Sequence, residues 1–350
     1  MVTFIHFQNW EIGPENPCFI IAEAGVNHNG RMDLAKALID SAVQAGADAI
    51  KFQTFKTEKL VTTQAPQANY QIQSTGSVES KFDMNKRLEL SYAQFQELYE
   101  YCQEQKILFL SSPFDEESAD FLESLGVVAF KIGSGEITNL PLLTHVAQKN
   151  KPVLLSTGMS YLGEVEDAVR TIYRAGNDKL ALFHCTSDYP AVPSDVNLRA
   201  MHTLAGAFGV PVGYSDHTEG NEISFAAVAL GACILERHFT LDKKLSGPDH
   251  RASLEPKEFE ALVKGVRKIE SALGDGRKIP AFSELNTALV ARKSLVAARD
   301  ILANTILTDD LIEIKRPGTG LPPSMKSVIL GRKIRVAINS GDLIKLENLE

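Results

Sequence analysis

Short apolar runs alternate with longer amphipathic segments over most of the chain. The runs cover residues 19–24, 48–53, 107–111, 127–132, 152–156, 180–184, 211–215 and 232–238. Each is almost continuously apolar and is bounded by glycine, proline or polar residues, as is typical of strands buried on both faces. The pattern therefore predicts eight strands of a parallel sheet.

The segments between the runs have the spacing of helices that bury one face. Residues 31–45 stop at Gly46, residues 92–105 place Phe95 and Cys102 on one face, and residues 256–272 begin with a proline. Strands that alternate with helices imply a sheet covered on both sides. Eight such units in this length favour a closed (β/α)8 TIM barrel, an α/β fold, over an open sheet.

Two segments depart from this rhythm. Residues 54–91 form a long polar connection after the second strand, which we expect to cover a substrate, since long loops in compact domains are usually functional or disordered. The predicted domains are a catalytic barrel (1–273), a linker (274–289) and a small β-rich domain (290–350). In the last of these, we expect strands at residues 294–298, 311–315, 327–331, 333–338 and 343–347.

Composition narrows the class of protein. Hydrophobic residues make up 44% and charged residues 23% of the 350, as in ordinary globular proteins. A net charge of −8 argues against a nucleic-acid partner, although residues 290–350 are basic. The sequence shows no signal peptide and no run long enough to cross a membrane. Four scattered cysteines without a CxxC pair favour reduced thiols and a cytoplasmic location.

Polar or ionisable residues follow every predicted strand, at the end where TIM-barrel enzymes carry their chemistry. Lys51 and Lys131, with Ser134, Ser156 and glycine-rich turns, predict a site for a phosphate or carboxylate. The alternative is a pair of structural ion pairs of the lysines with Glu23 and Glu136.

His217 and His238 end neighbouring predicted strands, so their rings should lie close enough to share one divalent metal ion. Glu23 is a candidate contributor, because a closed barrel places the first strand beside the last. The alternative is a pair of structural histidines, and the lack of a thiolate cluster argues against structural zinc. His184 is a weaker candidate that we expect to face the barrel interior.

Other chemistries have little support in the sequence. It has no GxSxG elbow and no GxxxxGK[ST] loop, and its GSGE segment is too short for a dinucleotide fingerprint.

The strand-end motifs resemble those of the sialic acid synthase family. They are IAEAGVNHNG, KFQTF, SSPFD, KIGSGEITN, LLSTGMS, HCTSDYP, GYSDHTEG and ERHFTLD followed by GPDH. Members of that family condense phosphoenolpyruvate with an N-acylated hexosamine to give a nine-carbon 2-keto acid. The tail, with KRPGTGLPP, resembles the antifreeze-like SAF domain, which in this family closes the barrel of a partner in a domain-swapped homodimer.

The resemblance implies a role for each matching residue. His217 and His238 would hold a divalent metal, typically Mn²⁺, with Mg²⁺ or Co²⁺ as other choices, and Glu23 would lie at the reacting centre. Phosphoenolpyruvate would contact Lys51, Gln53, Ser112, Lys131, Ser134 and Ser156. The sugar would contact Glu136, Tyr189, Asp249 and, from the tail of a partner subunit, Arg316. The family often has threonine in place of Ser112, and either residue supplies a hydroxyl.

The identity of the sugar stays open at this stage. N-acetylmannosamine would give N-acetylneuraminate, a 2,4-diacetamido-2,4,6-trideoxymannose would give N,N'-diacetyllegionaminate, and the altrose-type isomer would give pseudaminate. The AEAGVNHNG and APQANYQ segments favour the first two products. Two other classes compete: a metal-dependent barrel aldolase or hydrolase, which would not need the phosphate-binding lysines, and a binding protein with an inactive barrel.

Overall fold

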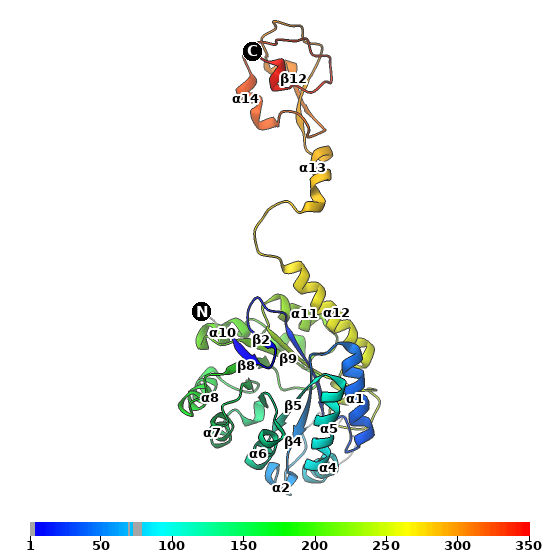
Figure 1. Cartoon of the computed structure of the whole chain (residues 1–350), viewed down its shortest axis with the longest axis vertical. Helices are drawn as coiled ribbons and strands as arrows, with labels where there is room; N and C mark the ends of the chain where they lie inside the picture. The colour runs from blue at the N-terminus through cyan, green and yellow to red at the C-terminus, as the bar shows by residue number, and fades with distance from the viewer. Residues whose placement is uncertain (1–3, 69–70, 73–78) are drawn as a thin grey trace. The chain divides into compact units, whose positions relative to one another are not determined.

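The computed structural model describes residues 4–68, 71–72 and 79–350 (Figure 1). The chain divides into two compact units, Met1–Gly274 and Asp275–Glu350. Each unit is described below by itself.

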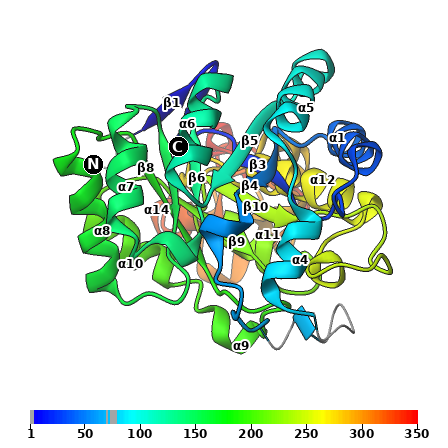
Figure 2. The same ribbon diagram turned by 90° about the horizontal axis from the view of Figure 1, so that it is seen from below.

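The first unit is built on eight parallel strands in the described residues. Along the sheet their order is β5-β4-β3-β10-β9-β8-β7-β6, and β5 also contacts β6, which closes the ring. Figure 2 shows the strands in the middle of the unit with helices around them. The predicted TIM barrel is therefore confirmed. The strands are β3 (Phe19–Gly25), β4 (Ala49–Thr54), β5 (Leu108–Pro113), β6 (Phe130–Ile132), β7 (Val153–Ser156), β8 (Leu180–Cys185), β9 (Val212–Asp216) and β10 (Ile234–His238).

Local signals in the sequence set the ends of the surrounding helices. Ser91 and Gln94 form a capping box at the start of α5, Asp115 caps α6, and Gly46 and Gly126 end α1 and α6 in the left-handed conformation. The predicted helices at 31–45, 92–105 and 256–272 are confirmed. The helices are α1 (Met32–Ala45), α5 (Tyr92–Gln105), α6 (Glu116–Leu125), α7 (Leu140–Gln148), α8 (Leu162–Arg174), α9 (Pro193–Val196), α10 (Ala200–Phe208), α11 (Glu222–Ala229) and α12 (Pro256–Leu273).

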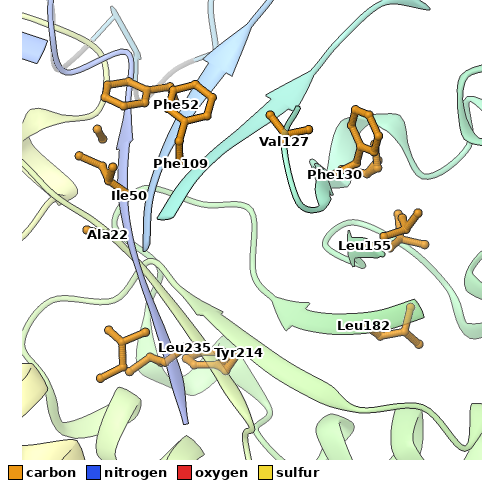
Figure 3. Packing of buried hydrophobic residues seen from close by; sticks show 14 of the residues in the cluster. Ala22, Ile50, Phe52, Phe109, Val127, Phe130, Leu155, Leu182, Tyr214 and Leu235 are labelled. Atoms are coloured by element: carbon orange, nitrogen blue, oxygen red, sulfur yellow. The ribbon is translucent and has the colours of Figure 1, made fainter. Parts of the chain in front are cut away.

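Alternation along each strand sorts the side chains into two layers. One set packs under the helices and is fully or almost fully buried; Figure 3 labels Ala22, Ile50, Phe52, Phe130, Leu155, Tyr214 and Leu235 among its members. The residues next to them along the chain face the interior of the ring, because successive strand residues point to opposite faces. Alternation thus turns Glu23, Lys51, Lys131, Glu236 and His238 inward at the carboxyl end of the barrel.

A hairpin that the sequence analysis did not predict packs against the amino end of the barrel. Its strands are β1 (Ile5–Phe7) and β2 (Trp10–Ile12), which pair antiparallel. The rings of Phe7 and Trp10 meet the ring of Phe19 edge-on, with centroids 5.3 and 4.9 Å away. These residues join one buried apolar cluster with the first inward-facing residues of the barrel strands. The chemistry-bearing side chains are therefore left to the opposite end.

In its described residues, the long connection after β4 includes the helices α2 (Thr57–Leu60) and α4 (Lys81–Leu88). Its residues 69–70 and 73–78 lie outside the described residues, so the predicted substrate-covering loop is described only in part. Four apolar side chains of the described part pack with two from outside the connection at the carboxyl end of the barrel. We call these the mouth cluster: Val26, Phe55, Leu60, Met84, Leu88 and Phe114.

The second unit contains α13 (Leu285–Ala291), an antiparallel pair β11 (Ser294–Ala297) and β12 (Ile312–Lys315), and α14 (Lys326–Ile329). The strand expected at 327–331 is wrong, since most of this segment is helical: Ile329 is fully buried, whereas Val328 and Leu330 are exposed. Segments 333–338 and 343–347 make isolated bridges rather than continuous strands. Ile334 and Ile338 are the buried residues of the first segment, and Val336 between them is exposed.

Candidate active site

A cavity of about 550 Å³ opens at the carboxyl end of the barrel. Among the thirteen site residues predicted from the sequence, the structure brings twelve together around this cavity: Glu23, Lys51, Gln53, Ser112, Lys131, Ser134, Glu136, Ser156, Tyr189, His217, His238 and Asp249. The remaining one, Arg316, lies in the second unit, where its exposed guanidinium donates a hydrogen bond to the carbonyl of Ala291 at 2.9 Å.

Two buried lysines form the floor of the cavity. The Nζ of Lys51 lies 2.8 Å from Oε2 of Glu23 and donates to Oγ of Ser112 at 3.2 Å. The Nζ of Lys131 donates to Oγ of Ser156 at 2.6 Å. Each of these groups is at least 96% buried. Ammonium and hydroxyl donors that meet at one point are the groups that bind phosphate and carboxylate oxygens.

Glu236 connects the two lysines. Its Oε2 lies 3.7 Å from Nζ of Lys51 and its Oε1 lies 3.5 Å from Nζ of Lys131. Ser215, its register partner on β9, donates to Oε1 at 3.0 Å. The sequence analysis considered Glu136 as a partner of the lysines; this is wrong, because no ion pair joins Glu136 to either lysine in the described part of the chain.

Glu236 and Ser215 are the functional candidates that sequence reasoning missed. Each lies two residues before a candidate metal ligand on its strand, Glu236 before His238 and Ser215 before His217. The period-two rule therefore places each on the same inward face as its histidine. Applying that rule backwards along the chain from each histidine would have found both.

Burial and charge act against each other in this cluster. Burial raises the pKa of Glu23 to about 7, despite the attraction of Lys51. Burial would also raise the pKa of Glu236, but Lys131 and Lys51 outweigh it and lower that pKa to about 2. The pKa of Lys131 is lowered by burial. Glu236 is thus the fixed counter-charge of the floor, whereas burial moves the pKa of Glu23 towards the neutral range.

His217 and His238 both line the cavity and lie side by side, with ring centroids 5.3 Å apart. The Nδ1 of His217 donates to the carbonyl of Thr186 at 2.7 Å, so its lone pair is on Nε2, where Oγ of Ser215 is 3.5 Å away. Burial lowers the pKa of His217 to about 4 and that of His238 well below its usual range, which keeps both rings neutral.

Two neutral, buried imidazoles suit a divalent ion of intermediate softness. The Nδ1 of His238 is buried and has no hydrogen-bond partner among the described residues. Buried polar atoms normally have a partner, so this one indicates that a further group binds at the ring. In the same part of the chain, no cluster of three or more His, Cys, Asp or Glu side chains could hold a metal. The residues therefore fit a metal that receives two ligands from the protein and the rest from elsewhere.

Tyr189, Asp249 and Glu136 also line the cavity. The Tyr189 ring lies 4.2 Å from that of His217 and 5.4 Å from that of His238. Asp249 is buried, which raises its pKa to about 6. Glu136 is half-buried and accepts a hydrogen bond from Nδ2 of Asn139 at 2.8 Å. These three residues offer polar groups to a substrate.

Gly158 approaches the site through its backbone. Its N–H donates to Oγ of Ser134 at 3.0 Å, and Sγ of Cys185 lies 3.1 Å from the same oxygen. A Cβ at position 158 would lie 2.8 Å from that oxygen and 2.3 Å from Oγ of Ser187. A side chain at residue 158 would therefore displace the hydroxyl of Ser134.

His184 does not face the barrel interior, and that expectation is wrong. It neighbours the inward-facing Phe183 on β8, so alternation turns its ring outward, where Nε2 is 2.6 Å from the carbonyl of Val196. Burial lowers the pKa of His184. The ring therefore anchors α9 and is not a site residue.

Comparison with known proteins agrees with the resemblance seen in the motifs. The model of the NeuB family matches residues 38–278, and that of the SAF domain matches residues 292–350. The chain is 48% identical to the N,N'-diacetyllegionaminic acid synthase of Campylobacter jejuni over 93% of its own length and 98% of the relative. It is 41% identical to the N-acetylneuraminate-9-phosphate synthase of Mus musculus, over 97% and 94% of the two chains.

A solved structure is also similar to this chain in sequence and fold. The crystal structure of N-acetylneuraminic acid (sialic acid) synthetase from Leptospira borgpetersenii, in complex with citrate, is 38% identical to this chain. It superposes with a TM-score of 0.73 over 82% of this chain and 95% of the other. With a family model that spans most of the barrel, and relatives matched along nearly their whole length, this chain belongs to the NeuB family.

Proposed function

We propose that this protein is a nonulosonate synthase, which condenses phosphoenolpyruvate with an N-acylated mannosamine-type sugar to a nine-carbon 2-keto acid and phosphate. The observation that carries the proposal is the floor of the cavity, where Lys51 and Lys131 converge on Glu236 beside three serine hydroxyls. Such a floor suits a small molecule with both a phosphate and a carboxylate. The names of the relatives support a synthase of the sialic and legionaminic acid type.

In this proposal, phosphoenolpyruvate lies on the floor. Lys51 and Lys131 balance its charge, and Ser112, Ser134 and Ser156 donate hydrogen bonds to its oxygens. Buried charges of this kind act strongly on the transition state because little water screens them. A divalent cation such as Mn²⁺, held by His217 and His238, would supply a Lewis acid for the sugar's aldehyde.

The bonds change in a definite order. The terminal carbon of phosphoenolpyruvate forms a bond to the aldehyde carbon of the open-chain sugar, and the aldehyde oxygen gains a proton. Water adds to the oxocarbenium carbon that results, and Glu23 would accept the proton that this water gives up. The tetrahedral intermediate then expels phosphate by C–O cleavage and leaves the 2-keto group. Tyr189, Glu136 and Asp249 would orient the sugar.

The proposal extends to assembly and location. In a homodimer with exchanged C-terminal domains, Arg316 of a partner subunit would reach the sugar's N-acyl group. The four cysteines all lie in the described residues, where they are buried and form no disulfide, which supports a reducing compartment such as the cytoplasm. Across the same residues, no helix combines the length and apolar character needed to span a membrane.

Phosphate release tests the proposal. The full-length protein with Mn²⁺ and phosphoenolpyruvate should release phosphate only when an N-acylated mannosamine-type sugar is added. N-acetylmannosamine, 2,4-diacetamido-2,4,6-trideoxymannose and the altrose-type isomer should be assayed in parallel. Sugar cleavage or hydrolysis without phosphoenolpyruvate would instead indicate the aldolase or hydrolase class. Truncation near residue 280 should abolish turnover while the barrel stays folded; unchanged turnover would refute the role of Arg316.

A further inference from the structure

The segment that carries Asp249 to the cavity has little regular structure of its own. Residues 241–249 form turns and bends after β10, and a single 3₁₀ turn, His250–Ala252, follows Asp249. Asp249 is nonetheless buried and lines the cavity. The position of its backbone therefore depends on contacts with other parts of the chain.

Those contacts come from the turn after β3, at residues 27–29 of the AGVNHNG motif. Asn27 and His28 are at least 98% buried. The lining of the cavity, as far as the structure describes it, takes Glu23 and Val26 from this stretch but none of the three residues of the turn. The proposed function gives this turn no role, and buried polar side chains are normally retained for the hydrogen bonds they make.

Asn27 bridges two segments that carry site residues. Its Nδ2 donates to the carbonyl of Phe239, the residue after His238, at 2.8 Å, and to Oγ of Ser253 at 2.9 Å. That hydroxyl in turn donates to the carbonyl of Asp249 at 2.7 Å. A chain of two hydrogen bonds thus runs from Asn27, through one buried hydroxyl, to the backbone of Asp249.

A second contact ties the residue after Asp249 to the same turn. Nε2 of His250 lies 3.2 Å from Oδ1 of Asn29, and its Nδ1 lies 2.7 Å from Oγ1 of Thr240. Gly247 packs closely on this contact, since a Cβ there would lie 2.6 Å from Cδ2 of His250 and 2.9 Å from Oδ1 of Asn29. The backbone on both sides of Asp249 is therefore held against residues 27–29.

We propose that Asn27 and Asn29 are positioning residues, which hold the backbone of Asp249 where its carboxylate meets the sugar. This inference rests on the proposed function, in which Asp249 contacts the sugar. Asn27 acts through Ser253, and Asn29 acts through His250. Loosening either contact should weaken binding of the sugar, because a misplaced carboxylate no longer orients it.

Binding of phosphoenolpyruvate should not change in the same variants. Lys51 and Lys131 lie on β4 and β6, and their partners are Glu236, Glu23 and serine hydroxyls of the barrel strands rather than the turn at residues 27–29. A purely structural role would instead lower stability without separating the two substrates. The KM values for sugar and phosphoenolpyruvate therefore distinguish positioning from general support.

The assay measures phosphate release by the full-length protein with Mn²⁺, with phosphoenolpyruvate and the sugar varied in turn. The sugars are N-acetylmannosamine, 2,4-diacetamido-2,4,6-trideoxymannose and its altrose-type isomer. Ser253→Ala removes the linking hydroxyl and should raise the KM for the sugar about tenfold, as the loss of one buried hydrogen bond allows. Asn27→Ala should raise it further, because both acceptors lose their donor. Gly247→Ala tests the second contact and should act in the same direction.

Asn177→Ala is the matched control. Asn177 is 1% exposed, and its Nδ2 likewise donates to two backbone carbonyls, those of Ala147 and Lys151, at 3.3 and 2.8 Å. It lies just before β8, at the amino end of the barrel. Its loss should lower the temperature of thermal unfolding, as in Asn27→Ala, and leave both KM values unchanged.

The outcomes separate this inference from the function on which it rests. If the wild type shows no sugar-dependent phosphate release, both are overturned. If the wild type is active, a wild-type sugar KM in folded Ser253→Ala and Gly247→Ala proteins would overturn the inference alone. An equal rise in the KM values for sugar and phosphoenolpyruvate would do the same, since it would show general loosening of the site. Thermal unfolding identifies which variants are folded.

Discussion

Arg237 and Asp216 form a buried ion pair on the outer face of β10 and β9. Nη1 of Arg237 lies 2.8 Å from Oδ2 of Asp216, and both side chains are at least 99% buried. Nη2 of Arg237 also donates to the carbonyl of Gly220 at 2.8 Å, and Thr218 donates to Oδ1 of Asp216. Each member of the pair lies between two inward-facing site residues, so the pair fixes the strand ends that carry the histidines.

Removing one partner of this pair should therefore destabilise the barrel. We expect Arg237→Met to lower the free energy of unfolding by about 3–5 kcal/mol, because Asp216 would keep a buried charge without its counter-ion. Urea unfolding followed by circular dichroism measures this. The double variant Arg237→Met/Asp216→Asn should recover part of the loss. A single variant within 1 kcal/mol of the wild type would show that the pair is not structurally important.

A methyl group at residue 158 should disturb anion binding. In Gly158→Ala the new Cβ meets the hydroxyl of Ser134, so we expect the KM for phosphoenolpyruvate to rise about tenfold or more. Gly163→Ala is the matched control: Gly163 lies in α8, and no atom outside its own helix would lie within 4 Å of the added Cβ. That control should keep its kinetics and gain slightly in stability. Equal KM values in both variants would refute the close-approach argument.

Acid should destabilise the protein through two buried histidines outside the site. Burial lowers the pKa of His28 and of His250 to about 4, against an ordinary value near 6.5. As the pH falls from about 6.5 to 4, the unfolded chain binds protons that the folded chain does not. Each histidine therefore costs up to about 1.4 kcal/mol of stability per pH unit in this window, and nothing above it.

Urea unfolding between about pH 7 and pH 5 checks this effect. His28→Asn should show a shallower fall in stability than the wild type, although its stability at pH 7 will be lower. The exposed His202 supplies the control, since His202→Asn should follow the wild-type slope. The prediction fails if His28→Asn and the wild type lose stability in parallel.

His217 and His238 should bind the metal ion, and this binding can be measured without an activity assay. His217→Ala and His238→Ala should each lose bound Mn²⁺, measured by electron paramagnetic resonance of the free ion after equilibrium dialysis. His145→Asn, at the surface on α7, should bind as the wild type does. Retention of Mn²⁺ by both alanine variants would show that these imidazoles are not the metal ligands.

Most of the barrel and its inward-facing groups could be predicted from sequence because one rule governs both. Near-continuous apolar runs mark strands buried on two sides, and alternation places the site residues near their ends on one face. Lys51, Lys131 and the two histidines all follow this pattern. Glu236 follows it too, but its role as partner of both lysines depends on distances across the ring.

Other features could not be predicted because they depend on contacts between distant segments. The hairpin at Ile5–Ile12 has strands of three residues, too short for a periodic pattern. The mouth cluster draws on four segments whose apolar residues look ordinary one by one. The segment around Ile329 is an apolar run, which is typical of a strand. It forms a short helix instead, and only Ile329 is fully buried there.

The central claim is that the lysine floor binds phosphoenolpyruvate for condensation with a sugar. The most direct test compares sugar-dependent phosphate release by the wild type and by Lys131→Met, with mass spectrometry of the product and Lys179→Met, an exposed lysine, as control. The wild type and the control should form a nine-carbon 2-keto acid with one phosphate released for each, and Lys131→Met should lose at least about 100-fold in kcat/KM. Wild-type turnover in Lys131→Met, or a product that lacks the three carbons of phosphoenolpyruvate, would contradict the account.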